Sequence, residues 1–149
     1  MGRPVLHPTD FSKASSAAFA RSLVEARQTK SELVILHVLA PIVPLAGATE
    51  GYLSPQLYEE MSTSARAAAD KQLARLLARA RTARVKARSL LAEGVAHEEI
   101  VRVAKRLRAG VIVVGTHGRT GVVQLVLGSV AARVAATAPC PVLTVRGRG

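Results

Sequence analysis

Runs of consecutive apolar residues alternate along this chain with longer segments in which apolar residues recur every three or four positions. The runs lie at residues 5–7, 33–39, 111–114 and 141–146, and Pro8 is expected to end the pairing of the first. Residues 85–91 are expected to form a further strand, although polar residues interrupt them. A short apolar run of this kind is typical of a strand buried on both faces of a parallel sheet. Helical spacing covers residues 12–27, 57–80, 97–108 and the segment that begins at Ser129.

The order of these elements predicts the fold class. Strands and helices alternate from the first strand to the last, which is typical of parallel strands joined by crossover helices. The chain has 149 residues, 49% of them hydrophobic, and shows neither an internal repeat nor a domain boundary. We therefore expect one α/β domain, residues 1–149, with a parallel sheet covered by helices on both faces.

Local signals predict where several helices begin and end and which side they bury. Ser12 is expected to cap the first helix, with Phe11 as a hydrophobic staple, and Gly110 to close the third helix. The segment from Pro41 to Pro55 is rich in Pro and Gly and long for a connection, so it is a candidate mobile cover or partner surface. The second helix should bury a stripe of Met61, Ala65, Ala69, Leu73, Leu76 and Ala80.

A glycine-rich loop joins the fourth strand to the last helix. Its glycines and serine follow the spacing Gly-x2-Gly-x9-Gly-Ser, from Gly115 through Gly118 and Gly128 to Ser129. Glycines next to a helix start can cradle a phosphate, and Arg119 adds a charge. The spacing is neither the Walker nor the Rossmann pattern, so a plain glycine-rich connection is an equal alternative. If the loop binds phosphate, a Cβ at Gly118 or Gly128 should strain the backbone or crowd the ligand.

Asp10 is a second candidate for ligand binding, because it follows the first strand at the edge where open parallel sheets bind ligands. A turn or capping role is the alternative, and on the residues alone it is the stronger one. His37 lies inside the second strand and is expected to be packed and hydrogen-bonded. No second histidine or carboxylate stands at a spacing typical of a metal site, so we expect no metal ligands.

Composition narrows the function further. The 21 Lys and Arg against 10 Asp and Glu give a net charge of +11, yet no aromatic residues are interleaved with the basic ones, as base stacking would need. The basic residues therefore indicate solvated helix faces, and nucleic-acid binding is the weaker interpretation. The single cysteine, Cys140, excludes an intramolecular disulfide, and no apolar run approaches the roughly 20 residues of a membrane span. These features predict a cytoplasmic protein with no membrane contact.

The chain resembles the universal stress protein family, in its ATP-binding subclass, over nearly its whole length. The resemblance rests on PTDFS at Pro8 to Ser12, LHV at Leu36 to Val38 and GTHGRTG at Gly115 to Gly121. It continues with LGSVAARV at Leu127 to Val134 and CPVLTVR at Cys140 to Arg146. The family's nucleotide signature, the glycine-serine spacing described above, is complete here. The combination is specific, although each piece alone would be weak.

The resemblance implies a Rossmann-like, five-stranded parallel sheet of order 3-2-1-4-5 that binds ATP, with Mg²⁺ or Mn²⁺ held through the phosphates. It also implies a homodimer formed through the last strand, from Pro141 to Arg146, and a regulatory role in stress response. Asp10 would form a hydrogen bond with the nucleoside end of the ATP. The adenine and ribose would lie near Pro8, Thr9, Asp10 and Val38; Gly115, Gly118, Gly128 and Ser129 would hold ribose and phosphates; and Val114, Thr116, His117, Arg119 and Val130 would line the same site.

The chain departs from the family pattern at three places. His7 replaces an aliphatic residue beside the nucleotide motif and could alter the packing of the adenine pocket; Val95-Ala96 replaces an Asp-Pro helix start, and Gly110 replaces an Asp. Slow ATP hydrolysis is the alternative function. The sequence offers no Walker lysine and no second acidic residue near the loop, and His117 is the only plausible base.

Overall fold

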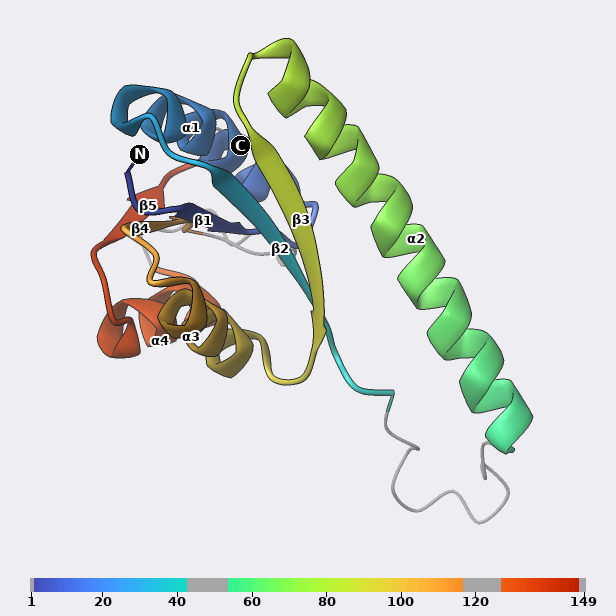
Figure 1. Cartoon of the computed structure of the whole chain (residues 1–149). Helices are drawn as coiled ribbons and strands as arrows, with labels where there is room; N and C mark the ends of the chain where they lie inside the picture. The colour runs from blue at the N-terminus through green and yellow to red at the C-terminus, as the bar shows by residue number, and fades with distance from the viewer. Residues whose placement is uncertain (1, 43–53, 117–126, 148–149) are drawn as a thin grey trace.

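The computed structural model of the chain describes residues 2–42, 54–116 and 127–147 (Figure 1). Five parallel strands form one sheet of order β3-β2-β1-β4-β5, which confirms the fold expected from the sequence. The strands are β1 (Val5–Pro8), β2 (Leu33–Leu39), β3 (Ala87–Glu93), β4 (Val111–Gly115) and β5 (Val142–Val145). The helices between them are α1 (Lys13–Thr29), α2 (Pro55–Thr82), α3 (Ala96–Leu107) and α4 (Ser129–Thr137).

The helices cover the two faces of the sheet in pairs, α1 with α2 and α3 with α4 (Figure 1). Under α1 and α2, Val5, Ile35 and Val113 pack against Phe19 and Leu73. Under α3 and α4, alternate residues of the same strands, such as Leu6, Val34 and Ile112, form the second core. The central strands β1, β2 and β4 are therefore buried on both faces, and this is why they are mostly apolar in sequence.

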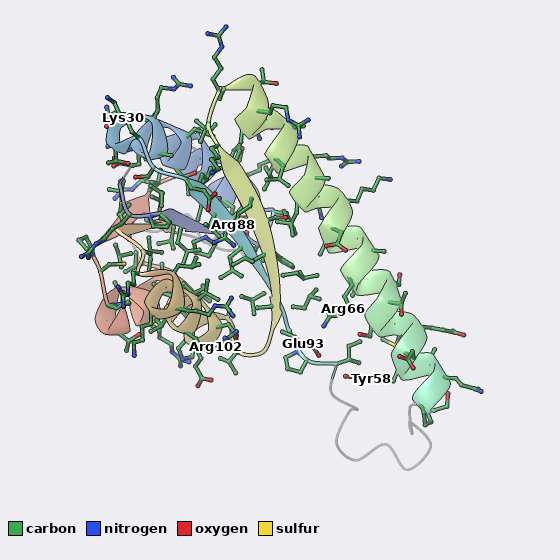
Figure 2. All side chains as sticks on the ribbon, viewed as in Figure 1. Lys30, Tyr58, Arg66, Arg88, Glu93 and Arg102 are labelled. Carbon is green, nitrogen blue, oxygen red and sulfur yellow. The ribbon has the colours of Figure 1, made fainter. Side chains whose placement is uncertain are left out.

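The helix α2 is longer than its apolar stripe. Ala69, Leu73 and Ala80 are buried as expected, but Met61 is 42% exposed and lies in the N-terminal half, which extends past the ends of the strands (Figure 1). The prediction that Met61 lies in the inner stripe is therefore wrong. An ion pair of 2.9 Å between Arg66 and Glu93 ties this half of the helix to the end of β3 (Figure 2).

Two helices end on a basic residue in the left-handed conformation. Lys30 follows α1 with φ 52°, and Arg108 follows α3 with φ 52°. The N–H of Ala109 donates to the carbonyl of Ala104 over 3.0 Å, which completes the turn that closes α3. Arg108, rather than the expected Gly110, therefore ends this helix. The N–H of Gly110 instead donates to the carbonyl of Pro4, 2.8 Å away, and starts the sheet contact of the next strand.

The third strand lies two residues later than expected. The N–H of Val85 donates to the carbonyl of Ala80 over 3.0 Å, so this residue belongs to the end of α2. The strand β3 then begins at Ala87 and pairs along its whole length with β2, ending at the Leu39–Glu93 pair.

Candidate functional site

A cavity of about 210 Å³ opens where β1, β2 and β4 end and where α3 and α4 begin. In an open parallel sheet, ligands bind at this edge, between neighbouring strands whose connections leave in opposite directions. β1 and β4 are such a pair, because β1 continues to β2 and β4 continues to β5 on the other side. The cavity is lined by Pro8, Thr9, Asp10, Ser15, Leu36, His37, Val38, Ala96, Ile100, Val114, Gly115, Thr116, Gly128, Ser129, Val130 and Ala131.

Pro8 contributes to the opening between β1 and β4. The N–H groups of Val5 and Thr9 donate to the carbonyls of Glu32, just before β2, and of Leu36 in β2. The alternation of the strand therefore turns the nitrogen of Pro8 toward β4. Proline has no N–H to donate, and the pairing of β1 with β4 stops at Leu6. The pairing with β2 continues to Pro8 and no further, so β1 ends at Pro8 as expected. The two central strands are thus free to diverge at the mouth of the cavity.

The turn between β1 and α1 is held by its own side chains. Asp10 accepts through Oδ1 from the N–H of Ser12, at 3.0 Å, and from the hydroxyl of Ser15, at 2.6 Å. Ser12 caps α1 by accepting from the N–H of Ser15 at 3.2 Å, as expected. Phe11 adopts φ 63°, a conformation that few side chains take, and this network keeps it there. Asp10 therefore has the turn role foreseen for it and also lines the cavity.

His37 joins this turn to β2. Its Nδ1 lies 2.7 Å from the carbonyl of Thr9, and because a carbonyl only accepts, Nδ1 carries the hydrogen. The ring also lies against Phe11, with 4.5 Å between the ring centroids. These contacts confirm the packed, hydrogen-bonded histidine expected at this position. His37 further lines the cavity, a role that the sequence did not indicate.

The glycines that line the cavity were expected to make room for a phosphate, but the structure gives a different reason for Gly115. A Cβ on Gly115 would lie 2.9 Å from the carbonyl oxygen of Ala14, so this glycine is needed for the approach of α1. Gly128 has φ −56°, which any residue adopts, so the expectation of backbone strain at Gly128 is wrong. The other half of the expectation, that a Cβ at Gly128 would crowd a bound phosphate, stays a prediction.

The start of α4 presents polar groups to the cavity. Gly128 caps the helix without a side-chain hydrogen bond, and its own N–H donates to the carbonyl of Thr116. The hydroxyl of Thr116 is buried and has no hydrogen-bond partner among the described residues. Ser129 and Val130 form the first turn, whose N–H groups have no acceptor within the helix. Asp10 is the one carboxylate in the described wall, and no lysine or arginine lines it.

A sequence profile of the universal stress protein family matches residues 1–146, nearly the whole chain. The chain belongs to the universal stress protein family. It is 33% identical to the universal stress protein MJ0531 of Methanocaldococcus jannaschii over 97% of this chain and 82% of the relative. It is also 33% identical to a Thermus aquaticus universal stress protein encoded in the 3′ region of QAH/OAS sulfhydrylase, over 98% and 100% of the two chains.

Solved structures agree with this membership. The M. jannaschii protein MJ0577 superposes with a TM-score of 0.84 at 25% identity and covers 100% of this chain and 99% of its own. A universal stress protein family protein from Arabidopsis thaliana, solved with AMP bound, shares the fold with a TM-score of 0.70 at 22% identity, over 98% and 92% of the two chains. None of the helices in the described ranges of this universal stress protein has the length and hydropathy of a membrane span.

The cavity gathers most of the residues that the family resemblance implied. Ten of them line it: Pro8, Thr9, Asp10, Val38, Val114, Gly115, Thr116, Gly128, Ser129 and Val130. His117, Gly118 and Arg119 lie outside the described residues. Six further lining residues were not expected: Ser15, Leu36, His37, Ala96, Ile100 and Ala131. Ala96 and Ile100 could have been found from the helix start at this sheet edge, whereas Ser15 and His37 reach the wall only through the fold of the turn.

His7 does not itself line the described wall of the cavity. Its ring lies under α1, 5.8 Å from the ring of Phe19 between centroids. Nδ1 lies 2.9 Å from the carbonyl of Val113, while Nε2 is buried without a partner among the described residues. Burial lowers the pKa of His7 to about 4, although the Val113 carbonyl and the charge of Asp10 act to raise it. His7 is therefore a neutral member of the core of this universal stress protein.

Proposed function

We propose that this universal stress protein binds ATP in the cavity at the carboxyl ends of β1 and β4 and acts as a dimeric regulatory module in stress response. One observation carries the proposal. Residues from four separated parts of the sequence, at 8–10, 38, 114–116 and 128–130, line a single cavity. These are the positions at which the family resemblance implied nucleotide contacts.

The nucleoside end of the cavity has the chemistry that adenosine needs. Leu36, Val38 and Ile100 supply apolar walls for a flat base, and Val114 adds a fourth apolar surface. Asp10 is a hydrogen-bond acceptor at the same end. Its Oδ1 is already used by the turn, so the carboxylate is held in a fixed orientation and loses little freedom on binding.

The phosphate end relies on dipoles and hydroxyls. The first hydrogen bond within α4 runs from the N–H of Ala132 to the carbonyl of Gly128, so the N–H groups of Ser129 and Val130 precede it. A helix start of this kind attracts anions, and the hydroxyls of Ser129 and Thr116 add donors. Mg²⁺ or Mn²⁺ would be carried on the phosphates of the nucleotide.

Two structural relatives are consistent with an adenine nucleotide. The Arabidopsis protein was solved with AMP and another universal stress protein with cAMP. Their likeness to this chain is one of fold, at 22% and 23% identity. The argument for ATP therefore rests on the cavity and the motif residues of this chain.

Calorimetric titration with ATP and with adenosine tests the proposal. Ser129→Ala removes a hydrogen bond to a charged group, worth roughly 1.5–3 kcal/mol, so ATP should bind about ten- to hundredfold more weakly. Adenosine has no phosphate, and its affinity should stay unchanged. Asp10→Asn keeps an oxygen for the turn but removes the charge, and it should weaken both ligands by a similar factor.

Ser64→Ala is a matched control, because Ser64 is exposed on α2 and does not line the described wall of the cavity. It should bind both ligands as the wild type does. Wild-type protein that binds no adenine nucleotide at millimolar concentration, with or without Mg²⁺, would show the proposal to be wrong.

A further inference from the structure

A second cavity, of about 260 Å³, lies between the start of α1 and the middle of α2, on the opposite side of the sheet from α3 and α4. Its polar lining includes Arg75, Arg79 and Gln72 from α2 and Ser12 and Ser16 from α1. Phe19 and Leu76 form part of its apolar wall. Nothing in the adenine-nucleotide proposal uses these side chains.

The two arginines stand four residues apart on the same side of α2, and both are exposed. Like charges at this spacing repel one another. Other arginines of the chain have carboxylate partners, such as Glu93 for Arg66 and Glu32 for Arg88. Among the ion pairs of residues 2–42, 54–116 and 127–147, none involves Arg75 or Arg79. An anion between the two would relieve their repulsion.

The guanidinium of Arg79 is already oriented. It stacks over the ring of Phe19, 4.9 Å from the ring centroid. A guanidinium stacked in this way keeps its edge N–H groups for an anion, and it loses less rotational freedom when it binds one. Arg75, one turn earlier on α2, can approach the same anion from the other side.

The α1 side of the cavity offers hydroxyls rather than open backbone donors. The N–H groups of Ser15 and Ser16 are bonded to Ser12, so these two backbone donors of α1 are occupied. The hydroxyl of Ser16 is exposed at the cavity and makes no hydrogen bond among the described residues. Asp10 lines the first cavity and not the second, so the described wall contains no carboxylate. The binding energy must come from the arginines.

We propose that this second cavity binds a compact dianion of the phosphate class, as free phosphate or as a small phosphate ester. Arg75 and Arg79 would hold its oxygens, with Gln72 and Ser16 as neutral donors. The site shares only Thr9 and Ser15 with the described wall of the adenine cavity, and none of the described residues of the glycine-rich loop lines it.

An NMR titration of the full chain with inorganic phosphate tests this proposal at the residues concerned. Ionic strength is held constant with chloride, and the Nε–H signals of Arg75 and Arg79 and the amides of residues 12–16 are followed. These signals should shift together and saturate with one dissociation constant in the millimolar range or below. Absence of a saturable shift at these residues would overturn the proposal.

Two double variants carry the same loss of charge. Arg75→Gln with Arg79→Gln should weaken phosphate binding roughly tenfold or more, because two charge-assisted hydrogen bonds are lost. Lys71→Gln with Arg81→Gln changes two exposed cations of α2 that do not line the described wall of the cavity, and it should leave the binding curve unchanged. Equal weakening in both doubles would show unspecific attraction to a basic helix and would refute the site. Arg75→Gln alone keeps the stack on Phe19, so it guards against loss of folding, and it should weaken binding roughly threefold or more.

Two further titrations identify the class of ligand and the cavity in which it binds. Phenyl phosphate that binds tighter than inorganic phosphate indicates an ester, and equal affinity indicates free phosphate. Phosphate binding that falls in Ser129→Ala but not in the arginine double variant would place the anion at the glycine-rich loop and overturn the proposal. Because no nucleotide is present in the titration, its result stands whether or not the protein binds ATP.

Discussion

Acidification should destabilise this protein through His7, a buried imidazole in β1. Burial lowers the pKa of His7 to about 4. The unfolded chain takes up a proton at this residue near the ordinary pKa of about 6.5, whereas the folded protein resists it until near pH 4. Between these values the unfolded state binds more protons, so stability falls as the pH falls. The contribution of the neutral imidazole is complete above pH 6.5 and is lost progressively toward pH 4.

The size of the effect follows from the two pKa values. Between pH 7 and pH 5 the linkage amounts to about 2 kcal/mol, a large part of the 5–15 kcal/mol by which a domain is stable. His7→Asn retains a side-chain donor for the carbonyl of Val113 but cannot titrate. Its free energy of unfolding should therefore fall by about 2 kcal/mol less than that of the wild type over this range.

Urea unfolding followed by far-ultraviolet circular dichroism at pH 7, 6 and 5 measures the difference, since the chain has no tryptophan for fluorescence. His97→Asn removes a half-buried imidazole of α3 and serves as the control, which should follow the wild type. Wild type and His7→Asn with the same pH dependence would refute the reasoning, because His7 would then titrate alike in both states.

Two further predictions concern the sheet. The wild type should be a dimer by light scattering at micromolar concentration, formed through the edge strand β5. The neighbours of Thr144 in β5 are hydrogen-bonded to β4, so the N–H of Thr144 points away from the sheet. Thr144→Pro removes this N–H and should give a folded monomer, whereas Thr144→Val keeps it and should stay a dimer. A monomeric wild type would contradict this. Gly115→Ala places a Cβ 2.9 Å from the carbonyl oxygen of Ala14 and should lower the free energy of unfolding by about 1–3 kcal/mol in urea titrations. A change below about 0.5 kcal/mol would mean that α1 shifts without strain.

The central part of the sheet could be predicted from the sequence because β1, β2 and β4 are buried on both faces. Leu33 to Leu39 form β2 as expected, since nothing but a central strand accommodates such a run. The end of α3 and the extent of the buried stripe of α2 were less predictable. Arg108 closes α3 because the hydrogen bond from Ala109 to Ala104 outweighs the preference for glycine, and propensity at Gly110 cannot reveal that bond. Met61 continues the helical spacing of the apolar stripe of α2, but it lies beyond the sheet and is exposed. The spacing of apolar residues alone does not show where the sheet ends.

The residues of the site could be predicted where they belong to a recognisable motif. They were harder to predict where the direction of a side chain determines whether it lines the cavity. His7 precedes Pro8 in β1, but successive residues of a strand face opposite sides, so the histidine lies under α1 instead of in the described wall. Ser15 enters the wall through its hydrogen bond to Asp10, a contact set by the unusual conformation of Phe11. The need for Gly115 arises from the packing of α1, a long-range contact that no local spacing shows.

The two cavities share part of one wall, because Thr9 and Ser15 line both of them. An occupant of either cavity that shifts the turn between β1 and α1 therefore changes the shape of the other. Thermodynamic linkage makes such an influence reciprocal: whatever factor a dianion imposes on nucleotide affinity, the nucleotide imposes on the dianion. The turn would then make the occupancy of each cavity depend on the concentrations of both ligands, and the hydrogen bond between Asp10 and Ser15 would connect the two cavities.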